Sequence, residues 1–197
     1  MSDTPVDTSK RTWLIASGCM GAVGGAFTAV PFVSSFQPSE RAKAAGAPVE
    51  ADISALKPGE KMTVEWRGKP VWIMRRTKEE LATLPTLDSE LADPRSERKP
   101  EEFTPEYARN ETRSIKPEVL VVVGICTHLG CSPSDRFQTG PQPSLPDDWK
   151  GGFFCPCHGS TFDLAGRVYK NKPAPDNLVV PPHMYLSDNR VLIGEDQ

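Results

Sequence analysis

The sequence predicts a mainly β protein, a small antiparallel sandwich or barrel preceded by one transmembrane helix. The chain has 197 residues, the length of one ordinary domain with an appendage. Residues 12–39 carry no charge, and many short segments rich in β-branched and aromatic residues follow that run. The 20 prolines and 15 glycines indicate many loops, and the near balance of 23 Lys plus Arg against 26 Asp plus Glu argues against a nucleic-acid partner.

The uncharged run from Thr12 to Ser39 is the first element. It exceeds the roughly 20 apolar residues that a helix needs to cross a bilayer core, so we expect a transmembrane anchor over residues 12–38. Lys10 and Arg11 precede it, and the positive-inside rule then puts residues 1–11 in the cytoplasm and the rest of the chain on the outer side. A cleaved signal peptide is the alternative, but no small-x-small cleavage site follows at the usual distance.

The segment Ser9–Ile15 resembles a twin-arginine export signal with Lys10 in the first basic place. An export signal that is retained as an anchor predicts a single-pass protein of a bacterial inner (plasma) membrane, with its head in the periplasm. Residues 39–48 are mostly small or charged and show no apolar stripe, and the tether that they form is taken to extend to residue 51. We therefore expect a flexible hinge there and a head domain over residues 52–197.

The head begins with a predicted β-hairpin. Lys61–Trp66 and Pro70–Arg75 are typical of strands and flank the short loop Arg67-Gly68-Lys69. The segment Thr77–Leu81 carries a capping box, which predicts one short helix.

The rest of the head combines a highly charged stretch with further strands. Fifteen of the 31 residues from Asp88 to Glu118 are charged, and prolines interrupt the stretch, so we expect an exposed insertion. Val119–Ile125 is continuously apolar and β-branched, as a strand buried on both faces should be. Later strands are expected at Phe153–Cys155, Thr161–Leu164, Leu178–Val180, His183–Leu186 and Val191–Ile193.

Two short clusters hold four of the five cysteines and two of the three histidines. They are Cys126-Thr127-His128-Leu129-Gly130-Cys131 and Cys155-Pro156-Cys157-His158-Gly159-Ser160. Thiolate and imidazole groups bind borderline and soft metals, and tight loops at strand ends can direct them at one point. Six candidate ligands exceed the four of a tetrahedral zinc site, although zinc and two plain disulfides remain alternatives.

Both clusters match the sequence boxes of Rieske proteins, and the chain resembles the iron–sulfur subunits of cytochrome bc complexes over nearly its whole length. The resemblance implies a Rieske-type head with a cluster-binding subdomain and one [2Fe–2S] cluster, whose histidine ligation raises the potential into the range of about −150 to +300 mV. It also implies a disulfide between Cys131 and Cys157, a pair that Rieske ferredoxins and oxygenases lack. The implied ligands are Cys126 and Cys155 on one iron and His128 and His158 on the other.

The same resemblance implies a subunit of a quinol–cytochrome c reductase. We expect it to take an electron and a proton from quinol at cytochrome b and to pass the electron to a c-type cytochrome, within a dimeric complex in which the head swings on the hinge. Iron would take Nδ1 of each histidine, and the exposed Nε2 of His158 is the atom expected to contact quinol. The expected docking tip, which enters the quinol pocket, consists of Leu129, Gly130, Pro173, Ala174 and Pro175.

Some positions depart from the family pattern. Phe162 replaces a tyrosine that many respiratory relatives use to donate a hydrogen bond to a cluster cysteine, whereas Ser160 keeps the companion donor, so we expect both positions to tune the potential. Lys172 stands where many relatives have glycine. An alternative assignment is the Rieske small subunit of a periplasmic molybdenum oxidase such as arsenite oxidase, but the retained span and the proline loop (Lys172–Pro175) favour the bc complex. His183 is expected to be an ordinary surface or packing histidine.

Overall fold

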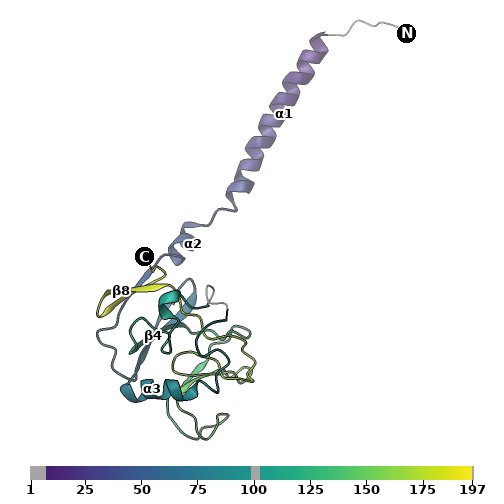
Figure 1. Ribbon diagram of the computed structural model, residues 1–197. Helices are drawn as coiled ribbons and strands as arrows, with labels where there is room; N and C mark the ends of the chain where they lie inside the picture. The colour runs from purple at the N-terminus through teal and green to yellow at the C-terminus, as the bar shows by residue number, and fades with distance from the viewer. Residues whose placement is uncertain (1–7, 99–102, 197) are drawn as a thin grey trace. The chain divides into compact units, whose positions relative to one another are not determined.

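The computed structural model describes residues 8–98 and 103–196, and the chain divides into two units, residues 1–44 and 45–197 (Figure 1). The first unit is built on the helix α1 (Thr8–Ser34), whose 27 residues extend about 40 Å at 1.5 Å per residue. That length exceeds the roughly 30 Å of a bilayer core, and the helix is apolar enough to cross one. None of its residues is buried. It starts four residues before Thr12, and the short helix α2 (Glu40–Ala45) lies within the predicted hinge.

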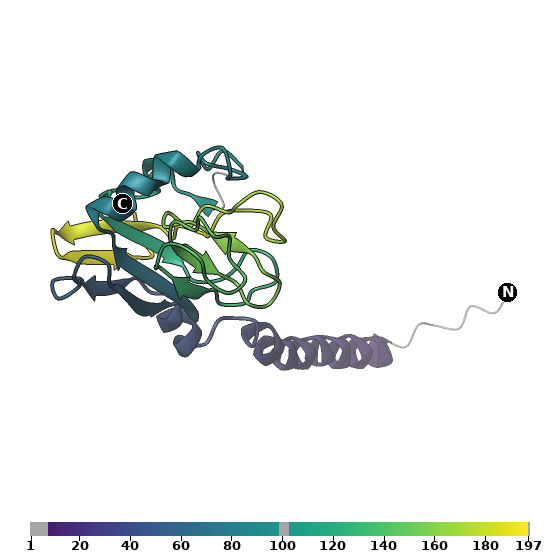
Figure 2. The ribbon, with the colours of Figure 1, turned by 90° about the horizontal axis from the view of Figure 1, so that it is seen from below.

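The described strands of the second unit form three-stranded antiparallel sheets in the orders β1-β9-β8, β2-β3-β4 and β5-β6-β7. This confirms the predicted mainly β, antiparallel class. In Figure 2 the yellow C-terminal hairpin of β8 and β9 is clearly visible. The elements are β1 (Val49–Asp52), β2 (Lys61–Trp66), β3 (Lys69–Arg75), α3 (Lys78–Thr83), the 3-10 turns η1 (Leu84–Leu87) and η2 (Glu106–Ala108), β4 (Val119–Val123), β5 (Ser134–Arg136), β6 (Gly152–Phe154), β7 (Thr161–Phe162), β8 (His183–Ser187) and β9 (Arg190–Ile193).

The predicted hairpin is formed by β2 and β3. Trp66 pairs with Lys69, and the two residues between them, Arg67 and Gly68, have φ values of 52° and 69°. Positive φ at both positions is the turn geometry that matches the twist of paired strands, and glycine adopts it without strain. The predicted capping box also forms, because the Thr77 hydroxyl accepts from the Glu80 N–H and the Glu80 carboxylate accepts from the Thr77 N–H.

The strand β4 lies between two hydrophobic cores. Successive side chains of a strand point to opposite faces. Val119, Val121 and Val123 therefore pack in the first core, which includes Val71 of β3. Leu120 and Val122 pack in a second core, which includes Trp72 of β3 and extends to the two Cys/His clusters. All of β4 is buried, as the uninterrupted apolar run predicts.

The charged stretch from Asp88 to Glu118 is not the exposed insertion that its composition predicts. Among its described residues, Leu91, Ala108, Ser114 and even Arg113 are buried. That prediction was wrong because a buried guanidinium is tolerated when carbonyl and hydroxyl groups of distant segments satisfy its N–H groups, and composition does not reveal those partners.

One predicted strand does not form, and two strands were not predicted. Leu178–Val180 is no strand, because its backbone bonds go to three separate segments: Leu178 N–H to Gly166, Val180 N–H to Phe103, and the Val179 carbonyl to Val123 N–H. Strands β1 and β5 were not predicted. β1 lies mostly within the predicted hinge and pairs with β9, so ordered structure of the head begins before residue 52.

Candidate metal centre

Two loops of matching construction carry the predicted ligands. Loop I (Cys126–Cys131) follows β4, and loop II (Cys155–Ser160) connects β6 to β7. In each loop the N–H of the first residue donates to the carbonyl of the sixth, at 2.7 Å in loop I and 2.8 Å in loop II. The fifth residue is Gly130 or Gly159, with φ of 84° or 75°, and its N–H donates back to the carbonyl of the first residue. Glycine adopts this left-handed conformation without a steric cost, which explains its place in both boxes.

The free thiols of the centre are Cys126 and Cys155, both buried. Burial raises the pKa of the Cys126 thiol and the neighbouring Cys155 adds to the rise, whereas hydrogen bonds from the His128 N–H and the Ser160 hydroxyl favour the thiolate. Two adjacent buried thiolates are costly unless a cation holds them. The pair is therefore suited to a metal centre.

The two imidazoles of the boxes lie against each other. The ring centroids of His128 and His158 are 4.7 Å apart and the rings are perpendicular. His128 Nδ1 is buried and, among the described residues, has no hydrogen-bond partner, which is costly for a polar atom unless a metal ion takes its lone pair. His158 is exposed. Two thiols and two imidazoles fit a [2Fe–2S] cluster with two protein ligands on each iron, although the same set would also fit one tetrahedral zinc ion.

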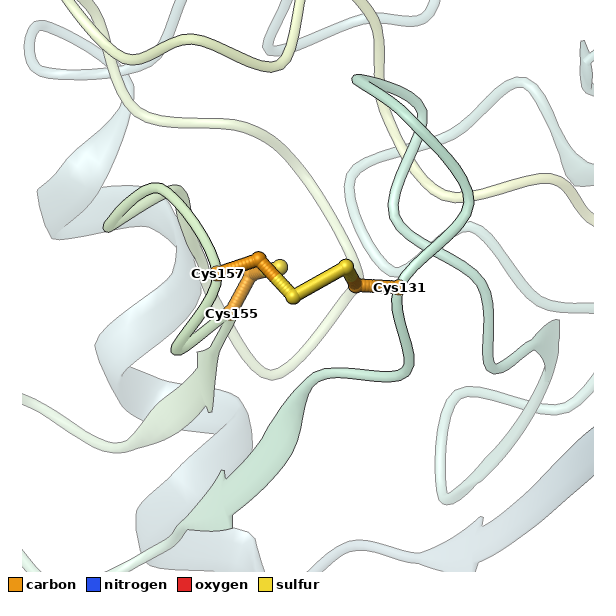
Figure 3. Close-up of side chains that lie close together, drawn as sticks. All are labelled: Cys131, Cys155 and Cys157. Atoms are coloured by element: carbon orange, nitrogen blue, oxygen red, sulfur yellow. A yellow bond between two sulfur atoms is a disulfide. The ribbon is translucent and has the colours of Figure 1, made fainter.

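The remaining two cysteines are joined. Cys131 of loop I and Cys157 of loop II form a disulfide with a Cα–Cα distance of 6.7 Å (Figure 3). The sulfur atoms of Cys131, Cys155 and Cys157 lie within 4.8 Å of one another, but the disulfide leaves only Cys155 of these three as a free thiol. The disulfide therefore leaves Cys126 and Cys155 as the free thiols of the two loops and ties the loops together beside them.

Of the five residues of the predicted docking tip, four are exposed and one is buried. Leu129 is 71% exposed, and Gly130, Pro173 and Pro175 are exposed as well. Ala174 is 3% exposed, and its N–H donates to the Ser160 hydroxyl at 2.9 Å. Ala174 thus fastens the proline loop to loop II and does not belong to the exposed tip.

Thr127 makes a contact in loop I that the sequence analysis missed. Its hydroxyl donates to the Asp176 carbonyl at 2.6 Å, which fastens loop I to the proline loop. Its location inside the first box was the available signal.

Two further side chains received predictions. Phe162 is fully buried in the second core together with Cys126 and Cys155, and it offers no hydroxyl to either sulfur. His183 is only 2% exposed, its Nδ1 lies 2.8 Å from the Pro181 carbonyl, and its ring packs edge-on against Tyr107. Of the two interpretations of His183, packing is therefore the correct one.

The fold and this ligand set define a class, the Rieske-type iron–sulfur proteins. Residues 97–182 match the family model described as the Rieske [2Fe-2S] domain, which favours the cluster over zinc. Residues 3–39 match a second model, described as the ubiquitinol-cytochrome C reductase Fe-S subunit TAT signal. The cofactor of the head is thus a [2Fe–2S] cluster of Rieske type.

Similar proteins identify the family. The chain is 58% identical to the ubiquinol-cytochrome c reductase iron-sulfur subunit of Allochromatium vinosum, over 100% of this chain and 94% of that one. The subunit of the same name from Blastochloris viridis is 41% identical, with 98% and 96% covered. A solved structure described as "Hyperthermophilic respiratory Complex III" matches with a TM-score of 0.48 and 29% identity, over 90% of this chain and 97% of that chain. With such identity over nearly complete lengths, the chain belongs to the family of ubiquinol-cytochrome c reductase iron-sulfur subunits.

Proposed function

We propose that this chain is the membrane-anchored electron carrier of a quinol–cytochrome c reductase. It takes an electron and a proton from quinol at cytochrome b and passes the electron to a c-type cytochrome. The observation that carries the proposal is the convergence of two free thiols and two imidazoles on matching loops in a chain of this family. Family membership also favours this role over that of a molybdenum oxidase subunit.

The proposed ligands are Cys126 and Cys155 for one iron and His128 and His158 for the other. The bound cluster supplies one chemical capability, which is the gain and loss of one electron. The chain supplies the rest. The Ser160 hydroxyl and the His128 N–H donate to the Cys126 sulfur and so favour its thiolate, and the disulfide keeps loops I and II together.

His158 is the proposed contact with quinol. Its ring is exposed, whereas His128 is half-buried, so Nε2 of His158 can meet a hydroxyl group of quinol and hold its proton. The neighbouring Leu129, Gly130, Pro173 and Pro175 are exposed and largely apolar, which suits a docking tip that enters a pocket of cytochrome b and excludes water around the transferred proton.

We place the protein in a bacterial inner membrane. The apolar helix α1, preceded by Lys10 and Arg11, supports a single span with the head in the periplasm. The match of residues 3–39 to an export-signal model of this family supports the same route. Cytochrome b and the c-type cytochrome are the proposed partners, in a dimeric complex whose head moves between them.

The decisive experiment purifies the full-length chain from membranes and measures iron, acid-labile sulfide and zinc. We expect two irons and two sulfides per chain, together with co-purified cytochrome b. Cys126→Ser and His158→Ala should abolish the cluster, while Cys19→Ser, which removes the free thiol of α1, should leave it intact. One zinc without sulfide in mature protein would refute the ligand proposal, and co-purification with a molybdenum-containing subunit would refute the partner.

A further inference from the structure

Three buried arginines hold the turn at residues 163–167, which follows loop II and the short strand β7. Arg76 donates to the Leu164 carbonyl, and Arg113 donates to the carbonyls of Ala165 and Gly166. Arg167 closes the same turn through the Asp163 carboxylate. The exposed fractions of the three arginines are 2% for Arg76 and 0% for the other two. Arg76 directly follows β3, Arg113 lies in the charged stretch and Arg167 lies at the end of the turn, so segments far apart in sequence bring positive charge to one place.

Among the residues that the structure describes, only Arg167 of these arginines is directly paired with carboxylates. Arg167 Nε lies 2.8 Å from Asp163, and its Nη1 lies 2.9 Å from Asp88. The hydrogen bonds that the structure gives to Arg113 go to the hydroxyls of Ser96 and Thr104 and to the carbonyls of Ala165, Gly166 and Leu178.

Arg76 is bound in the same way. Its partners are the Ser114 hydroxyl and the carbonyls of Thr112, Pro117 and Leu164. In the described part of the chain, the hydrogen bonds of Arg76 and Arg113 therefore reach only uncharged oxygens, and the charges of both arginines are neutralised only at longer range.

Both groups remain charged at neutral pH. Burial lowers the pKa of Arg76 and of Arg113 to about 10, while Asp163 acts on both in the opposite direction, as do Glu80 on Arg76 and Asp93 on Arg113. Asp93 is itself occupied, since its carboxylate accepts the N–H groups of Glu97 and Arg98. The two guanidinium groups thus act as permanent cations inside the head.

The segments that bind these cations pack in the same core as the candidate metal centre. Leu164, Ala165 and Leu178, whose carbonyls accept the arginine N–H groups, belong to the same buried cluster as Cys126 and Cys155. Charges in such a dry, low-dielectric environment act on one another more strongly than charges in water.

We propose that Arg76 and Arg113 are positioning residues that raise the midpoint potential of the iron–sulfur cluster. Reduction makes the cluster more negative by one unit, so incompletely neutralised buried cations stabilise the reduced form relative to the oxidised form. The same hydrogen bonds hold the turn behind loop II in place. This inference rests on the proposed function, because it assumes that loops I and II hold the cluster.

The test is a redox titration of the full-length protein in membranes, followed by electron paramagnetic resonance of the reduced cluster. Arg113→Gln removes the charge and should lower the midpoint potential. Arg113→Lys keeps the positive charge but loses the planar set of N–H donors of the guanidinium group. The midpoint potential of this variant should therefore lie nearer to the wild-type value than that of Arg113→Gln, even if the variant unfolds more easily. Arg95→Gln, at an exposed arginine of the same stretch, is the matched control and should leave the potential unchanged.

A second variant, Asp88→Asn, adds net positive charge at the same turn without changing a fully buried side chain. The Asp88 side chain is 38% exposed and pairs with Arg167, so Asp88→Asn should fold and should raise the potential by freeing positive charge. Equal shifts for Arg113→Gln and Arg113→Lys would overturn the electrostatic proposal, as would an unchanged or lowered potential for Asp88→Asn. If Arg113→Gln does not accumulate, the same comparison is made between Arg76→Gln and Arg76→Lys. Absence of the cluster signal in the wild-type protein would instead count against the ligand set.

Discussion

The disulfide between loops I and II allows a prediction with a magnitude. Replacing both Cys131 and Cys157 with serine removes a cross-link between residues 26 positions apart. For a closed loop of this size, the chain-entropy relation gives about 3.5 kcal/mol of lost stability at 25 °C. In a head of this size, each kcal/mol lowers Tm by about 2 to 4 °C, so the double variant should melt about 10 °C below the wild type.

The assay compares thermal unfolding of full-length wild-type protein, the double variant and Cys19→Ser, which removes a cysteine outside both loops. A second measurement follows the loss of the cluster's visible absorbance over time. It should fade faster in the double variant, because loops I and II are then held together only through the second core and the proline loop. A Tm within about 2 °C of the wild type, together with an unchanged cluster lifetime, would show that the bridge does not constrain the site.

Three further predictions concern single side chains. Phe162→Tyr should raise the midpoint potential, on the order of tens of millivolts, by supplying a donor to a cluster sulfur, and Ser160→Ala should lower it by removing one; voltammetry that gives no rise for Phe162→Tyr would mean that the ring is not directed at sulfur. The potential of the wild type should fall by about 59 mV per pH unit wherever reduction is coupled to uptake of the one proton that we propose His158 holds, and a potential that stays flat with pH would contradict this coupling. Burial lowers the pKa of His183 in the folded state below its ordinary value of 6.5, so the unfolded chain takes up this proton first and the free energy of unfolding should fall as pH drops below about 6.5. His183→Gln should weaken this pH dependence of the denaturation midpoint. Parallel curves for the variant and the wild type would contradict the prediction.

Several elements could be predicted because their signals are local. The β2–β3 hairpin depends on Arg67 and Gly68, which adopt the positive φ that the turn needs. The capping box of α3 lies within four consecutive residues, Thr77 to Glu80. The burial of β4 on both faces follows from an uninterrupted apolar run, which has no polar side to turn toward water.

Other elements depend on hydrogen-bond partners far away in the sequence, which no local pattern can identify. β1 is four residues long and is a strand because β9, more than 130 residues later, supplies its hydrogen bonds. Leu178–Val180 has the composition of a strand, yet its backbone groups bind three different segments and form no ladder. Ala174 was grouped with the exposed proline tip, but its N–H is turned toward Ser160 in the interior.

By itself, the sequence determined the chemistry of the site: two boxes contain every proposed ligand, and within each box spacing and a glycine control the local geometry. It also predicted the long apolar helix α1, since the uncharged run has the length and composition of a membrane-spanning helix. Only the tertiary structure decided the electrostatic environment of the site. Whether Arg76 and Arg113 lie in water or beneath the turn after loop II depends on carbonyl groups 52 to 88 residues away in the sequence. A charged residue looks the same in the sequence in either case, because its cost of burial is offset only by partners that folding brings to it.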